Sequence, residues 1–201
     1  MAPQWPCRTA IVSLLVSVLA GALGCASQGK VEVVPRPARP PVTQESVEWL
    51  NRGLAVQGNL EEEARCYSQA IRSDPSNGEA HNNLGVVHLE RGEYYTAAQH
   101  FAAAGRLLPE APQPAYNLGL LLEQAGKPEQ AAEQYERATA LAPGELAYKE
   151  CLARALIRCG GAKSRVRALL QECLELEVRP EWVSWIKTEL RQVEDRRNLS
   201  D

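Results

Sequence analysis

The sequence repeats itself every 34 residues, and this period constrains the fold more than any other feature. The segment NLGVVHLERG at 83–92 returns as NLGLLLEQAG at 117–126. Four further columns each recur three times in the same register: Gly58, Gly92 and Gly126; Tyr67, Phe101 and Tyr135; Ala70, Ala104 and Ala138; and Pro75, Pro109 and Pro143. A fixed period of this length indicates an array in which copies of one supersecondary unit stack on each other.

Each unit contains two helical patterns around its central glycine. One face of the second helix carries apolar residues spaced four, three and four apart: Ala97, Phe101, Ala104 and Leu108. Gly92 suits a tight turn between the two helices, and the recurring proline ends the second one. Because a pair this short cannot bury its apolar stripe alone, the copies are expected to stack.

The Leu-Gly pair, the turn glycine, the two alanine columns, the aromatic column and the final proline resemble the tetratricopeptide repeat (TPR). That resemblance implies an all-α solenoid with three clear repeats, at 44–77, 78–111 and 112–145. Thr43 is the expected N-cap of a first helix running from about Gln44 to Gln57.

Repeat one departs from the pattern in two places. Asn51 stands where glycine is expected, and Glu63 stands where alanine is expected. These departures predict a looser first helix pair, in which Leu60 or Ala64 takes up the packing.

The register continues weakly beyond residue 145, at Leu152, Ala153, Leu156 and Gly160. The terminal proline is delayed to position 180, which predicts a degenerate fourth repeat with a lengthened turn and Ser164 as a helix cap. The segment 181–201 then carries apolar residues on one helix face, namely Trp182, Trp185, Ile186, Leu190 and Val193. We therefore expect a TPR array at 44–180 and a C-terminal capping helix with a tail at 181–201.

A different kind of signal occupies residues 1–24. Arg8 and the amino terminus precede an apolar run from Ile11 to Leu23, which is short for a bilayer span and typical of a signal peptide. The run ends at Gly-Cys, which resembles a bacterial lipobox and implies cleavage after residue 24 and acylation, including palmitate, at Cys25. A simple cleaved signal and an uncleaved anchor are the alternatives.

Residues 25–43 contain four prolines and no helical period, so they predict an extended tether of about 3 Å per residue. An ordinary disordered tail is the alternative. Ala26 follows Cys25, whereas an aspartate there typically retains lipoproteins at the inner membrane. We therefore expect a bacterial envelope protein that is held on the outer membrane and faces the periplasm. Attachment to the inner membrane is the alternative.

Composition and motifs argue against nucleic-acid binding and catalysis. The net charge of -3 and a pI near 5.7 show no basic excess. The sequence has no glycine-rich phosphate loop, nucleophile elbow or His-Glu-x-x-His pattern. His81, His88 and His100 lack further ligands at a metal-binding spacing and are expected to be structural. We expect no enzyme, no cofactor and no metal; an envelope enzyme that uses His81 or His88 is a remote alternative.

The cysteines beyond the tether fit no zinc motif: Cys66, Cys151, Cys159 and Cys173. In an antiparallel fourth repeat, Cys151 and Cys173 would lie at similar heights on facing helices. We expect them to act as small apolar packing residues, with a disulfide between them as the alternative.

The candidate partner-binding residues follow from the TPR resemblance. In such arrays the sixth column of the first helix faces a concave groove, where asparagine bonds the backbone of an extended peptide. This implies a binding role for Asn83 and Asn117, since an amide offers a donor and an acceptor together. Asn82 and Tyr116 would widen the surface, and Trp49 would either stack on a ligand or cover the end of the array. Solvated helix amides are the alternative.

The layout resembles TPR lipoproteins that help to assemble outer-membrane machines, including the pilotins of type IV pilus secretins, and others that dock cell-wall hydrolases. The resemblance implies a membrane-anchored, non-catalytic adaptor or scaffold that binds a peptide or a protein surface, assisting an envelope machine of the pilus or secretion type. The alternative is a structural lipoprotein that forms homo-oligomers through the ends of its array, including Trp182 and Trp185. The sequence does not identify the partner.

Overall fold

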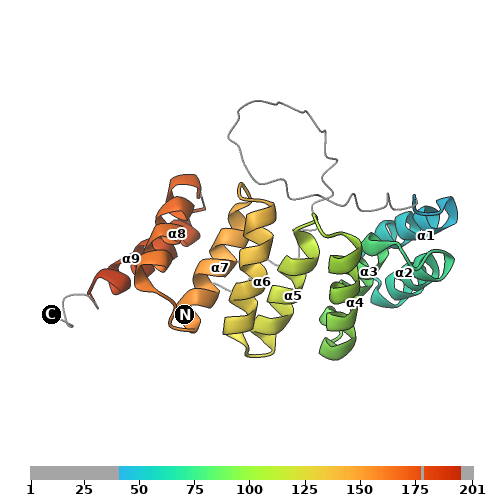
Figure 1. Ribbon diagram of the computed structural model, residues 1–201, viewed down its shortest axis with the longest axis horizontal. Coiled ribbons are helices and arrows are strands. Elements are labelled where there is room, and N and C mark those ends of the chain that lie inside the picture. Colours follow the sequence, from blue (N-terminus) through green and yellow to red (C-terminus); the bar gives the residue numbers. More distant parts are fainter. Residues whose placement is uncertain (1–40, 178, 196–201) are drawn as a thin grey trace, which may run out of the picture. The chain divides into compact units, whose positions relative to one another are not determined.

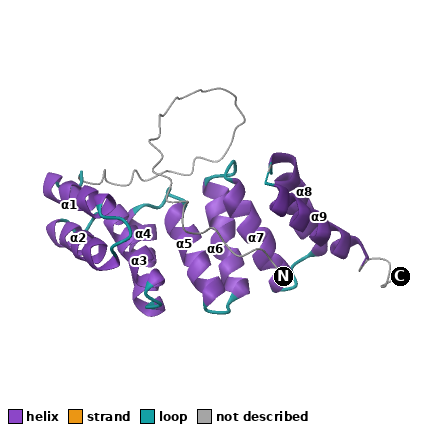
Figure 2. Cartoon of the chain, turned by 180° about the vertical axis from the view of Figure 1, so that it is seen from behind, coloured by secondary structure: helices purple, strands orange, loops and turns teal. Residues whose placement is uncertain are grey.

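The computed structural model describes residues 41–177 and 179–195, and every regular element among them is a helix. Figures 1 and 2 show the helices following one another in chain order. They are α1 (Gln44–Ala55), α2 (Leu60–Ser73), α3 (Gly78–Glu90), α4 (Tyr94–Leu107), α5 (Gln113–Gln124), α6 (Pro128–Leu141), α7 (Leu146–Arg158), α8 (Lys163–Leu176) and α9 (Pro180–Asp195). The expected all-α class is confirmed.

Each helix packs on the next one along the chain, and short turns join the members of each pair. The pairs are α1–α2, α3–α4, α5–α6 and α7–α8, so the degenerate fourth repeat forms a helix pair like the others. Helix α3 also contacts α5, which makes the first helices of successive repeats neighbours. This arrangement is the predicted solenoid, with three repeats, a fourth pair and a terminal helix.

The four turn glycines occupy the left-handed backbone region that other residues rarely adopt. Their φ angles are 95° at Gly58, 74° at Gly92, 72° at Gly126 and 71° at Gly160. Gly160 confirms that the fourth pair keeps the turn of the regular repeats.

A glycine in the first helix of each regular repeat receives the aromatic ring of the second. A Cβ atom at Gly119 would lie 2.5 Å from Cε1 of Tyr135, and one at Gly85 would lie 2.7 Å from Cε1 of Phe101. In repeat one the same contact is made by Gly53, whose Cβ would lie 2.4 Å from Tyr67. The expectation of a looser first pair was wrong, because Gly53 makes the close contact with the ring that the period assigned to a glycine at position 51.

Glu63 also has a definite place in the first pair. Its carboxylate accepts a hydrogen bond of 2.7 Å from the backbone N–H of Gly58, so it closes the turn between α1 and α2. Leu60 and Ala64 pack against the hydrophobic core of the first repeat, as expected.

The helix caps agree with the sequence at one end of the array and differ at the other. Thr43 caps α1 by accepting a hydrogen bond from the N–H of Ser46, but the helix ends at Ala55, two residues before the expected end. Ser164 is not a cap, which corrects the prediction. The N–H groups of Arg165 and Val166 both bond to the carbonyl of Ala162, so α8 already begins at Lys163.

Helix α9 covers the end of the core. Ile186 is fully buried and Trp182 nearly so, while Trp185, Leu190 and Val193 pack against the same core. That core includes Val166, Leu170 and Cys173 of α8. The predicted capping role of this helix is confirmed.

The N-terminal predictions fall mostly outside the described residues. The signal peptide at 1–24, the lipidation site Cys25 and the tether up to residue 40 are not described. Among the helices of the described part of the chain, none has the length and hydrophobicity needed to cross a membrane.

Candidate partner-binding face

Three side-chain amides form a connected row across α3 and α5. Asn117 Nδ2 donates to Asn82 Oδ1 at 2.9 Å, and Asn82 Nδ2 donates to Asn83 Oδ1 at 3.3 Å. All three side chains are half-buried, so they stay accessible from one side. We call this set, Asn82, Asn83 and Asn117, the amide row. The structure thus joins the residues that the sequence singled out in two successive repeats.

The direction of these hydrogen bonds sets what the row offers to a ligand. At one end, Asn83 Nδ2 remains as a donor, and at the other, Asn117 Oδ1 remains as an acceptor; neither bonds to another described residue. A peptide backbone presents a carbonyl and an N–H that match these two groups. The row is therefore chemically suited to an extended chain.

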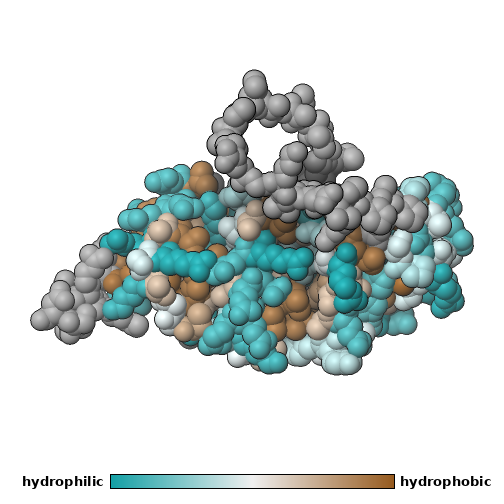
Figure 3. Space-filling view, viewed as in Figure 1, coloured by the Kyte–Doolittle hydropathy of each residue, from teal (hydrophilic) through white to brown (hydrophobic). Residues whose placement is uncertain are grey.

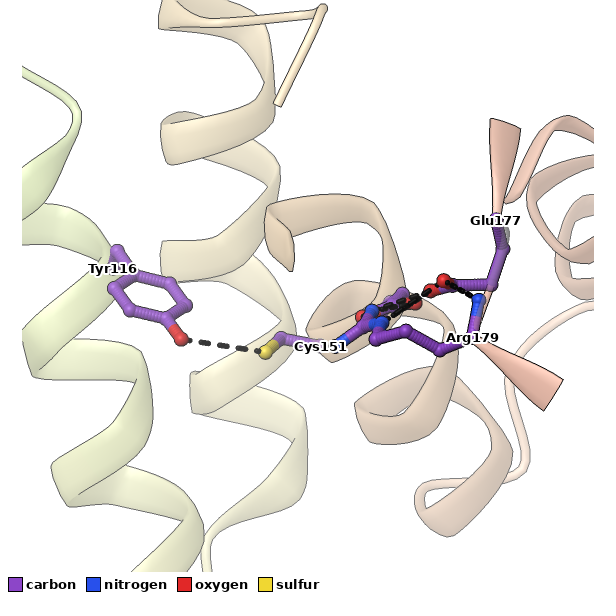
Figure 4. Close-up of polar contacts among 5 residues, drawn as sticks. Tyr116, Cys151, Glu177 and Arg179 are labelled. Atoms are coloured by element: carbon purple, nitrogen blue, oxygen red, sulfur yellow. Dashed lines mark hydrogen bonds and ion pairs between the residues drawn. The ribbon is translucent and has the colours of Figure 1, made fainter. Parts of the chain in front are cut away.

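Tyr116 stands beside the row on α5 and is held by other aromatic side chains. Its ring centroid lies 4.8 Å from that of Tyr148 and 5.9 Å from that of Tyr135. Its hydroxyl accepts a weak hydrogen bond from the Cys151 thiol, with the two atoms 3.9 Å apart (Figure 4). These contacts extend the surface from α5 towards α7 and fix the ring in place.

Trp49 is placed differently from the other candidates. Its ring packs on the hydrophobic core of the first repeat, and the guanidinium of Arg52 lies 4.4 Å above it. None of its described contacts is with the amide row. This position favours the alternative in which Trp49 covers the end of the array.

The three histidines meet between α3 and α4. His81 Nδ1 lies 3.1 Å from His100 Nδ1, and the ring of His88 stacks on that of His100 with centroids 5.3 Å apart. Burial, with help from the other two rings, lowers the pKa of His100 to about 4, and burial also lowers the pKa of His81. The sequence placed His81 and His88 on one helix but did not bring His100 to them. The only sign that His100 joins the cluster was its position next to Phe101.

Within 41–177 and 179–195, no group of three or more histidine, cysteine or carboxylate side chains has an arrangement that could hold a metal ion. Four described cysteines, at positions 66, 151, 159 and 173, are free thiols. Cys151 and Cys173 lie in one buried core, so they pack as small apolar residues and are not joined by a disulfide.

One buried charged network lies next to this face. The carboxylate of Glu123 in α5 accepts hydrogen bonds from Arg154 Nε of α7 at 3.1 Å and from the hydroxyl of Tyr135 in α6 at 2.9 Å. Arg158 adds a further ion pair at 3.2 Å. The network ties three successive helices together, and the sequence did not indicate it.

A second charged network ties α7 to the segment before α9. Arg179 Nη2 donates to Glu150 at 2.9 Å, and Arg179 Nε donates to Glu177 at 2.9 Å (Figure 4). Burial and the neighbouring Glu177 raise the pKa of Glu150 to about 7, while hydrogen bonds from Arg179 lower that of Glu177 to about 2. We call these three residues the Arg179 clamp.

Comparison with known proteins agrees with the repeat architecture. Residues 52–112 match a family model described as tetratricopeptide repeat, and residues 112–145 match a second one. This part of the chain therefore carries tetratricopeptide repeats, while α7, α8 and α9 lie outside both matches. The class that the fold and the matches define is a helical array that contains TPR repeats.

Two curated relatives share a short segment with the chain. It is 31% identical over 90 residues to the Superkiller complex protein 3 of Homo sapiens, and 29% identical over 90 residues to that of Mus musculus. Each alignment covers 44% of this chain but only 6% of the relative. The chain thus spans a small fraction of the length of these proteins.

Several solved structures share the fold. MamA from Desulfovibrio magneticus superposes with a TM-score of 0.65 at 19% identity, over 79% of this chain and 88% of that one. A Thermobaculum terrenum O-GlcNAc transferase mutant gives 0.61 at 24%, over 68% and 27%. The first TPR of Spaghetti (RPAP3), bound to an HSP90 peptide, gives 0.56 at 20%, over 59% and 95%. At these identities the likeness concerns the fold alone.

Proposed function

We propose that this protein is a non-catalytic adaptor that binds an extended segment of a partner protein along the amide row. The observation that carries the proposal is the hydrogen-bonded chain of Asn82, Asn83 and Asn117 across two repeats. The Spaghetti (RPAP3) domain, which shares the fold, was solved with a bound peptide, and this supports a peptide as the ligand.

The row suits this task because its members already hold one another in place. Binding then orders few side chains, which lowers the entropic cost of association. Each new hydrogen bond to a peptide contributes about 1 kcal/mol, so the row orients a ligand and adjacent contacts add affinity. Tyr116 supplies an aromatic surface at the α5 end of the row.

The experiment is to pan a random heptapeptide library against the full-length protein and against Asn83→Ala/Asn117→Ala. We expect the double variant to lose a set of peptides that the wild type and the control both retain, because both free ends of the row are removed. The control is Gln124→Ala/Gln130→Ala, which removes two exposed amides of α5 and α6. If the double variant recovers every peptide that the wild type and the control recover, the amide row is refuted as a binding face.

The anchor is the second part of the proposal: acylation at Cys25 holds the adaptor on the bacterial outer membrane, where it assists assembly of an envelope machine of the pilus or secretion type. The Gly-Cys end of the apolar run and Ala26 support it. We expect Cys25→Ser to move the protein from the membrane fraction to the soluble fraction and to abolish palmitate labelling. Labelling that persists in Cys25→Ser would refute the anchor.

Self-association is the competing function, because both ends of an array carry apolar surface. Trp182 is nearly buried and its ring meets that of Trp185 edge-on, so most of the surface that would pair copies is covered by the chain itself. We expect a detergent-solubilised protein whose mass per particle does not change with concentration in analytical ultracentrifugation. A concentration-dependent dimer would favour the oligomer.

A further inference from the structure

A hollow of about 280 Å³ opens between α4 and α6, and α5 forms its floor. Pro114 and Leu118 give the floor an apolar character, and the fully buried Phe101 of α4 lies beneath the side of the hollow. On the face seen in Figure 3, hydrophobic residues over α5 lie between hydrophilic residues over α4 and α6. The volume lies near the lower end of the roughly 300–1,000 Å³ of small-molecule pockets, so it suits one or two side chains of a partner.

Gly105 keeps this hollow open. A Cβ at this position would have no neighbour closer than 3.9 Å (Pro114) and 4.0 Å (Nη1 of Arg137). Glycine is costly in the middle of a helix, and here neither a close approach nor a turn requires it. A side chain at position 105 would therefore start beside the hollow with no close contact at its Cβ.

The rim of the hollow is positively charged. Arg106 and Arg137 line it, both are exposed, and no carboxylate is among the lining residues. Within the described part of the chain neither arginine forms an ion pair, whereas Arg154, Arg165 and Arg179 each do. Helix α5 starts at the floor with no side-chain cap and no acidic residue in its first turn, which also favours an anion.

We propose that this hollow binds an acidic segment of a partner protein, with a carboxylate between Arg106 and Arg137 and a neighbouring apolar side chain against Leu118. Guanidinium groups pair with carboxylates through parallel hydrogen bonds, so two of them select an acidic residue. The site goes beyond the amide row, because α4 and α6 contribute no residue to that row. The protein thus presents two peptide-binding surfaces that differ in chemistry.

The test pans the same heptapeptide library on the full-length protein. We expect the wild type to enrich peptides that combine Asp or Glu with a large apolar residue. Arg106→Gln/Arg137→Gln should lose them, and so should Gly105→Leu, which fills the hollow but leaves both charges in place. Arg72→Gln/Arg191→Gln is the control: it removes the same charge from exposed positions on α2 and α9.

Affinity then separates this site from the amide row. A synthetic peptide from the enriched set should bind Arg106→Gln/Arg137→Gln about tenfold more weakly than the wild type, since two exposed charge pairs are lost. The same peptide should bind Asn83→Ala/Asn117→Ala as it binds the wild type. The proposal is overturned if acidic peptides are not enriched or if Gly105→Leu retains them. It is also overturned if a version of the synthetic peptide with Gln in place of Glu and Asn in place of Asp binds the wild type equally well.

Discussion

At the scale of single residues, each of the first three helix pairs is held close where a glycine of one helix meets an aromatic ring of the other. The turn glycines follow directly from the 34-residue period, but Gly53 does not, because the period places Asn51 in that column. The first turn spans residues 56–59, one residue longer than the turn at 91–93, and the glycine that meets the ring lies two positions later in its helix than the period places it. A column alignment assumes equal turns in every repeat and therefore misses such a shift.

Gly119→Ala tests the ring contact. The added methyl would meet the buried ring of Tyr135, whose Cε1 lies 2.5 Å from the Cβ position, and the ring has no free space to enter. We expect the free energy of unfolding to fall by about 2 kcal/mol in urea denaturation, even though alanine favours a helix. The control is Gly144→Ala, where no atom lies within 4 Å and no change is expected. Equal stability of the two variants would contradict the contact.

The histidine cluster gives a prediction about pH. Folding lowers the pKa of His100 from its ordinary 6.5 to about 4, so the folded state binds fewer protons than the unfolded state between these values. Stability should therefore fall as the pH drops from about 6.5 towards 4. We expect His100→Gln to lose less stability than the wild type between pH 7.5 and pH 4.5 in urea denaturation. A steeper loss in the variant would show that His100 is not buried in its neutral form.

At the scale of helices, the fourth pair and α9 show which features a sequence pattern can predict. The apolar face of α9 was predictable from its spacing, and Ile186 and Trp182 are buried as that spacing requires. The Arg179 clamp was not predictable, because Glu150 and Arg179 lie 29 residues apart and meet only once α7 and the turn before α9 are placed. Patterns along the chain predict which face is buried, but not which charges pair across helices.

Ile186→Ala tests the capping role of α9. The side chain is fully buried against the core of α7 and α8, so its loss leaves a cavity where it packed. We expect the free energy of unfolding to fall by about 3 kcal/mol in thermal or urea denaturation. Lys187→Ala, on the exposed side of the same helix, should change it by no more than about 0.5 kcal/mol. If the two variants are equally stable, α9 does not close the core.

At the scale of the whole molecule, every helix packs on its neighbour in the chain, so the array offers long surfaces instead of one enclosed site. The period predicted this architecture, and the TPR resemblance predicted a partner-binding role for Asn83 and Asn117. It did not predict the bonds through Asn82, which depend on the lateral spacing of α3 and α5. Nothing in the pattern along the chain joins Arg106 to Arg137; they come to one hollow because α4 and α6 lie on either side of it.

The central claim is that a partner binds along the amide row. The most direct measurement is in-cell crosslinking of the full-length protein followed by mass spectrometry, beside Asn83→Ala/Asn117→Ala and the control Gln124→Ala/Gln130→Ala. We predict that the wild type and the control capture the same partner, with crosslinks to α3 and α5, and that the double asparagine variant loses it. Equal capture by all three proteins, or capture of the protein's own copies alone, would contradict the account.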